Sequence, residues 1–101
     1  MWIYHVTVKI VPGIREAWLH WMQHEHIQEV LATGMFDSFQ FFELIEPQDE
    51  EGFTFSIQYC TTSQERYQQY IESFAPSLRQ KGFEQFGDQF LAFRSILKKI
   101  D

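Results

Sequence analysis

The residues best suited to chemistry lie in a single run, Trp18-Leu19-His20-Trp21-Met22-Gln23-His24-Glu25-His26. This run contains two of the three tryptophans, three of the four histidines and one carboxylate. Imidazole and carboxylate groups are common proton carriers and metal ligands, and indole rings pack against flat apolar molecules. A ligand-binding or catalytic site of this chain is therefore expected here first.

A predicted helix carries this run, and a strand precedes it. Apolar and polar residues alternate from Trp2 to Val11, which predicts a strand that ends at Pro12-Gly13. Apolar residues at helical spacing then predict a helix from Ile14 to about Ala32, which Thr33-Gly34 ends.

The rest of the chain predicts a hairpin, a second helix and a last strand. An aromatic-rich run over 35–45 and an alternating run over 53–60 flank a polar loop at 47–52. Thr62-Ser63-Gln64-Glu65 has the pattern of a capping box, with Thr62 as the capping residue of the second helix. Pro76 is expected to kink or restart that helix, and Gly82 and Gly87 to close it. Residues 89–97 are expected to form the last strand.

The order βαββαβ predicts an α+β, ferredoxin-like fold in one domain over residues 1–101. In this fold two helices cover one face of a four-stranded antiparallel sheet. The other face carries both apolar and polar residues, so we expect a homodimer that packs sheet against sheet. The aromatic content of 18%, with eleven Phe, also favours a second buried surface or an apolar pocket.

Several separated motifs together resemble a known family. They are Trp18-x-x-Trp21-Met22-x-x-Glu25-His26-Ile27, Val30-Leu31-Ala32-Thr33-Gly34-x-Phe36, Ser73-Phe74-Ala75-Pro76 and Phe86-Gly87…Phe90-x-Ala92-Phe93-Arg94. The chain is similar to a family of uncharacterised bacterial proteins of this length, a domain of unknown function. That family looks like part of the dimeric α/β-barrel superfamily, which includes cofactor-free monooxygenases, isomerases and haem-degrading enzymes. The resemblance implies the fold and a dimer, but no particular reaction and no catalytic residue.

Glu25 is a candidate catalytic group. On a straight helix Glu25 continues the apolar stripe of Trp18 and Trp21, and burial would raise the pKa of its carboxyl, as general acid or base catalysis requires. The alternative is a bend or a change of helical phase near Glu25, because Ile27 and the apolar residues after it fall on a different side. His24 and His26 are the other candidate proton carriers.

His20 and His24 are weak candidates for a metal site. They stand four residues apart on the predicted helix, which is the spacing of two zinc ligands. A third ligand would have to come from His5 or Glu29, and solvated histidines are the simpler interpretation. No metal and no cofactor is therefore expected.

Aromatic residues from the two predicted helices are expected to meet above the sheet; they are Trp18, Trp21, Tyr67, Tyr70 and Phe74. They either fill the core or line a pocket for a planar apolar ligand, with His24, His26 or Arg94 as its polar groups. Haem binding is a further alternative, because haem-degrading relatives use a His ligand near a Trp.

Two classes of function follow. The first is a dimeric module without turnover that binds a small apolar molecule or has a structural role. The second is a cofactor-free monooxygenase or isomerase that uses Glu25, His24 or His26. The net charge of −6 argues against nucleic acids and anionic membranes as partners. No membrane span is expected. No internal disulfide is expected, because Cys60 is the single cysteine. A cytoplasmic location is expected.

Overall fold

In the computed structural model, which describes all of residues 1–101, β1 (Trp2–Ile10) is a central strand with one buried face. Its alternating sequence places Tyr4, Val8 and Ile10 in the core, while His5 and Thr7 lie on the opposite face. Pairing on both sides satisfies the backbone of β1 and fixes the register of the sheet.

The sheet has four antiparallel strands in the order β2-β3-β1-β4. The other strands are β2 (Ser38–Glu43), β3 (Phe53–Thr61) and β4 (Phe90–Lys98). Tyr4 pairs with Tyr59 on β3 and with Ile96 on β4. The predicted ferredoxin-like α+β fold is confirmed by this element order and strand order. The extended run expected over 35–45 is shorter as a strand, which spans only Ser38–Glu43.

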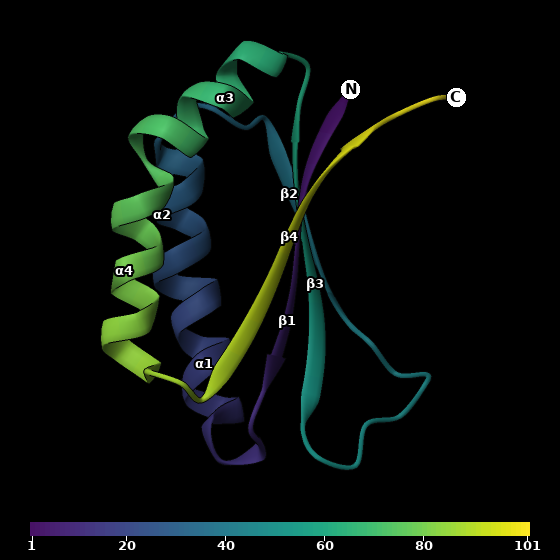
Figure 1. Cartoon of the computed structure of the whole chain (residues 1–101), viewed down its shortest axis with the longest axis vertical. Helices are drawn as coiled ribbons and strands as arrows, with labels where there is room; N and C mark the ends of the chain where they lie inside the picture. Colours follow the sequence, from purple (N-terminus) through teal and green to yellow (C-terminus); the bar gives the residue numbers. More distant parts are fainter.

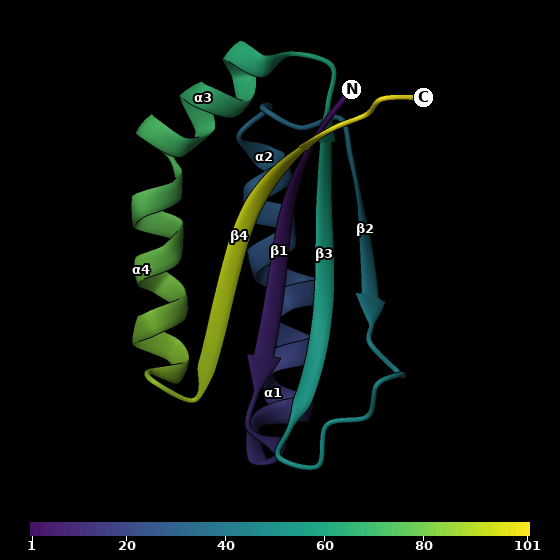
Figure 2. The same ribbon diagram turned by 45° about the vertical axis from the view of Figure 1, so that its right-hand side comes forward.

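Helices cover one face of the sheet and leave the other uncovered (Figure 1). The elements of this layer are α1 (Arg15–Trp21), α2 (Ile27–Ala32), α3 (Gln64–Ser73) and α4 (Ala75–Phe86). Figure 2 shows α1 and α2 in line behind the sheet, with α4 on the side of the helical layer toward β4. None of the helices is long and apolar enough to cross a membrane.

A π-helical turn over Met22–His26 joins α1 to α2. The N–H of Ile27 donates to the carbonyl of Met22, five residues back, so this turn holds one residue more than an α-helical turn. Trp18 and Met22 are buried before the extra residue, and Ile27 and Val30 are buried after it. The helix therefore changes phase near Glu25, which is the alternative that the sequence pattern left open.

The second helical segment departs from the sequence prediction at two points. Ser63, not Thr62, caps α3: its hydroxyl accepts a hydrogen bond from the N–H of Arg66 at 3.1 Å. Pro76 lies in the first turn of α4 and restarts the helix, as expected. Gly82 does not close the helix but lies within α4, which ends at Gly87 with φ 61°.

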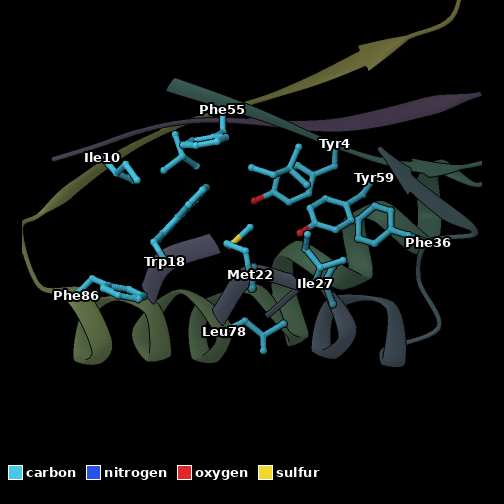
Figure 3. Close-up of a cluster of buried hydrophobic side chains, with 14 of the residues drawn as sticks. Tyr4, Ile10, Trp18, Met22, Ile27, Phe36, Phe55, Tyr59, Leu78 and Phe86 are labelled. Carbon is cyan, nitrogen blue, oxygen red and sulfur yellow. The ribbon is translucent and has the colours of Figure 1, made fainter. Parts of the chain in front are cut away.

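The core fills the space between the helices and the sheet (Figure 3). Trp18, which is 1% exposed, packs its indole against Phe55 with ring centroids 4.7 Å apart. Tyr4, Phe36 and Tyr59 form a second aromatic group, with centroids 5.4 to 6.0 Å apart. Full burial of large aromatic side chains is the main favourable contribution to folding in so small a domain.

Candidate functional site

A small cavity of about 50 Å³ lies between the sheet and the helices. Twelve of its sixteen lining residues are hydrophobic. The sheet contributes side chains from all strands except β2, and the helical layer contributes Trp18, Trp21, Met22, His26, Tyr70, Leu78, Arg79 and Gly82. The cavity thus continues the core, but it also reaches residues at the protein surface.

The phenol hydroxyls bring polar atoms to the apolar walls. Figure 3 shows the hydroxyls of Tyr4 and Tyr59 pointing inward, toward Met22. Burial raises the pKa of Tyr59 and of Tyr70 well above that of a free phenol. Both tyrosines therefore remain protonated and uncharged at neutral pH, and both can donate hydrogen bonds.

His26 lines the cavity at the end of the π-helical turn. Its Nδ1 is shielded from solvent and has no hydrogen-bond partner. Burial lowers the pKa of His26 from 6.5 to about 4, the positive charges of Arg94 and Lys81 act in the same direction, and Glu29 opposes them. The imidazole is therefore neutral at pH 7, and one of its nitrogens is available to a ligand or a water molecule.

Two arginines lie where the cavity meets the surface. Arg79 Nη2 donates a hydrogen bond to the Tyr4 hydroxyl at 3.1 Å, which joins α4 to the central strand. Arg94 projects from β4, and its backbone pairs with that of Val6. Both side chains are exposed, and neither is paired with a carboxylate.

Gly82 lies on the cavity wall inside α4, where a side chain would fit. A Cβ atom built on Gly82 lies 3.4 Å from Cη2 of Trp21 and 3.7 Å from Cζ of Phe90, which are ordinary contact distances. Glycine inside a helix costs roughly 0.5–1 kcal/mol relative to alanine. The chain therefore has a less stable helix at this position and keeps space beside Trp21.

The cavity brings together five of the residues that the sequence analysis proposed; they are Trp18, Trp21, His26, Tyr70 and Arg94. Tyr67 and Phe74 lie outside it: Tyr67 packs against Tyr4 at 5.8 Å between centroids, and Phe74 against Tyr70 at 6.5 Å.

Glu25 and His24 do not reach the cavity. Both side chains are exposed, and for Glu25 this agrees with the change of helical phase that the sequence pattern offered as the alternative to a buried carboxyl. His24 lies against His20, with ring centroids 4.4 Å apart. No group of three or more His, Cys, Asp or Glu side chains in residues 1–101 is placed to hold a metal ion.

Sequence reasoning missed Tyr4, Arg79 and Gly82 as cavity residues. Tyr4 and Arg79 are far apart in the sequence, and no local pattern links them. Gly82 did carry a signal, because it follows the buried Leu78 by four residues and so lies on the inner side of the helix.

Comparison with known proteins places the chain in a family. A family model described as "Domain of unknown function (DUF4286)" matches residues 1–100. The chain belongs to this family. The resemblance to a domain-of-unknown-function family, stated from the sequence motifs, is thereby confirmed. No curated protein matches the chain.

Several solved structures share the DUF4286 chain's fold. An ethyl tert-butyl ether d (ethd) family protein from Bacillus halodurans aligns with a TM-score of 0.73 and 14% identity, covering 99% of this chain and 100% of that chain. A dimeric ferredoxin-like protein from an uncultured marine organism aligns with a TM-score of 0.69 and 15% identity, covering 100% of this chain and 96% of that chain. A second dimeric ferredoxin-like protein from an uncultured marine organism aligns with a TM-score of 0.66 and 12% identity, covering 95% of this chain and 92% of that chain. At these identities the likeness shows the ferredoxin-like fold.

Proposed function

We propose that this protein is a homodimeric module that binds a small apolar molecule in the cavity between its helices and its sheet. The observation that carries this proposal is the cavity at Gly82. The cavity is lined mainly by apolar side chains, it reaches the surface, and it is kept open by a glycine at a helical position where alanine would fit. Apolar walls with a few polar groups are typical of small-molecule sites.

The residues around the cavity favour binding over acid–base catalysis. His26 is the only histidine that lines the cavity, and with a pKa of about 4 it is a weak base at neutral pH. Glu25 and His24, the other candidates for proton transfer, are exposed and lie outside the cavity. Binding of a small apolar molecule does not require a proton carrier, so the residues that line the cavity are sufficient for it.

The uncovered face of the sheet supports the homodimer. On β4 the side chains of Leu91, Phe93 and Leu97 are 62%, 67% and 42% exposed, and on β2 Phe42 is 47% exposed. Exposed apolar residues gathered on one face are typical of a surface that a partner covers. Two proteins of the same fold are described as dimeric, which favours a second copy as that partner.

A neutral apolar probe tests the cavity. We would expose the protein to xenon, which is small enough for a cavity of about 50 Å³, and follow the indole N–H signals of Trp18 and Trp21 by NMR. Binding should shift both signals in the unsubstituted protein. In Gly82→Val, whose added methyl groups enter the space beside Trp21, the shifts should be lost.

Gly13→Val is the matched control. A Cβ atom built on Gly13 meets no other atom, so a side chain there leaves the cavity unchanged and xenon should still shift the signals. Circular dichroism would establish that both variants fold. Xenon-induced shifts of equal size in the unsubstituted protein and in Gly82→Val would place the bound xenon outside the cavity and refute the proposal.

A further inference from the structure

Two arginines without an acidic partner line the cavity of this otherwise acidic protein. The protein has a net charge of −6, with fourteen acidic residues against eight Lys and Arg. Of its four arginines, Arg15 is paired with Glu43 and Arg66 with Asp37. Arg79 and Arg94 have no carboxylate partner, and both line the same cavity.

Arg79 and Arg94 line the same cavity as Tyr70. Both Arg79 and Arg94 act electrostatically on Tyr70, and Arg79 also donates a hydrogen bond to the Tyr4 hydroxyl. This hydrogen bond holds the side chain of Arg79, which belongs to α4, against Tyr4 of β1. Two positively charged side chains thus line one apolar space, where an anionic group would be attracted and an apolar group would be buried.

We propose that the ligand of this cavity is a small carboxylic acid, with its apolar part among Trp18, Trp21 and Met22 and its carboxylate at Arg79 and Arg94. A flat carboxylate matches the planar fork of a guanidinium group, which gives two parallel charge-assisted hydrogen bonds. His26, whose Nδ1 has no hydrogen-bond partner, and Tyr70 also line the cavity. A cavity of about 50 Å³ favours a short apolar chain over a ring or a long acyl chain.

This inference rests on the proposed function, because it needs the cavity to accept an apolar group. It adds the charge of the ligand and the two arginines at which that charge lies. A dianionic phosphate is disfavoured by the mainly apolar lining, and inorganic phosphate is therefore the competing probe.

The test compares acids with neutral analogues of the same shape. We would titrate the full-length protein with butyrate and hexanoate, and with butyramide and hexanamide, following the indole N–H signals by NMR at pH 7. Each acid should bind at least about tenfold more tightly than its amide, because the charge-assisted hydrogen bonds are lost in the amide. Affinity should rise by about fourfold for each methylene group until the cavity is full.

Three variants locate the carboxylate. Arg79→Gln and Arg94→Gln should each weaken hexanoate binding by about tenfold or more and leave hexanamide binding nearly unchanged. Lys99→Gln changes the net charge by the same amount at an exposed position away from the cavity, and should bind hexanoate as the unsubstituted protein does. Arg94→Lys keeps the positive charge but lacks the planar guanidinium group. Its affinity for hexanoate should therefore lie between those of Arg94→Gln and the unsubstituted protein.

Each outcome decides between the two proposals. Equal binding of hexanoate and hexanamide, or hexanoate binding that neither arginine variant weakens, refutes the carboxylate assignment and leaves the apolar site standing. Displacement of hexanoate by inorganic phosphate at comparable concentration also refutes it, in favour of phosphate. If neither the acids nor the amides shift the signals, both the assignment and the proposed function fail.

Discussion

The imidazole of His26 stacks on the indole of Trp21, with ring centroids 4.6 Å apart and planes inclined by 21°. Trp21 in turn makes an edge contact with Phe86, with ring centroids 5.5 Å apart, so the indole links the π-helical turn to the end of α4. A charged imidazolium has no hydrogen-bond partner for its Nδ1 in this position. Protonation of His26 therefore opposes folding.

The first prediction is an acid sensitivity due to His26. Its pKa is about 4 in the folded protein and 6.5 in an unfolded chain, so the unfolded state binds more protons between these values. Stability should be complete above pH 6.5 and should fall by about 3 kcal/mol as the pH drops to 4. Urea unfolding at pH 7.5 and 4.5 measures this loss.

His26→Phe is the control for that loss, since phenylalanine keeps the stacking on Trp21 and does not titrate. Its stability should change much less between the two pH values. Hydrogen bonds from Arg15 and Lys9 lower the pKa of Glu43 and Asp49, so these carboxylates reduce stability only at lower pH and do so in both proteins. Parallel pH dependence in the two proteins would contradict the prediction.

Gly82→Ala should stabilise the protein and impair ligand binding. Alanine removes the conformational cost of a helical glycine, roughly 0.5–1 kcal/mol, and its Cβ fits at ordinary contact distance from Trp21. Gly87→Ala should have the opposite sign, because Gly87 has φ 61° and alanine there costs of order 1–3 kcal/mol. Urea midpoints measure both changes, and a destabilised Gly82→Ala would mean that Trp21 cannot adjust.

Phe93→Asp should convert a dimer to a monomer. Phe93 lies on the uncovered face of the sheet, and a stable interface buries about 1,200–2,000 Å² in total. Sedimentation should give about twice 12.2 kDa for the unsubstituted protein and about 12.2 kDa for the variant. Phe83→Asp, at a residue 60% exposed on α4, should remain dimeric. An unsubstituted protein that sediments as a monomer at micromolar concentration would refute the dimer.

Ser63→Ala should destabilise the protein by about 1 kcal/mol, because it removes the hydroxyl that caps α3. Thr62→Ala should cost clearly less, since Thr62 is exposed and its hydroxyl contacts only the Arg66 side chain. Thermal unfolding of the two variants side by side tests the assignment. A larger loss for Thr62→Ala would return the cap to the residue that the sequence pattern favoured.

These two neighbours show how far local patterns reach. The capping-box pattern locates the start of α3 to within one residue, because both Thr62 and Ser63 are good caps and only the path of the chain from β3 selects one. Strand alternation in β1 and β3 was sufficient to predict the sheet faces and so the fold. These signals are local and repeated, which makes them robust.

The site was harder to predict because it depends on one inserted residue. A straight α-helix would direct Glu25 inward, and only the π-helical turn moves it into solvent and brings Ile27 into the core. Arg79 meets Tyr4 only after the sheet and α4 have assembled, so no spacing in the sequence could indicate that contact. The phase of a helix and the meeting of distant side chains are tertiary properties.

The position of β4 at the edge of the sheet has a consequence for solubility. One side of β4 pairs with β1, and its other side presents unpaired backbone groups beside exposed Leu91 and Phe93. Long apolar edge strands promote aggregation, and interspersed charges counteract it. Arg94 and Lys98 are the charged residues of β4, so they oppose edge-to-edge association of dissociated monomers. Concentrated or acid-treated protein should begin to aggregate at this strand.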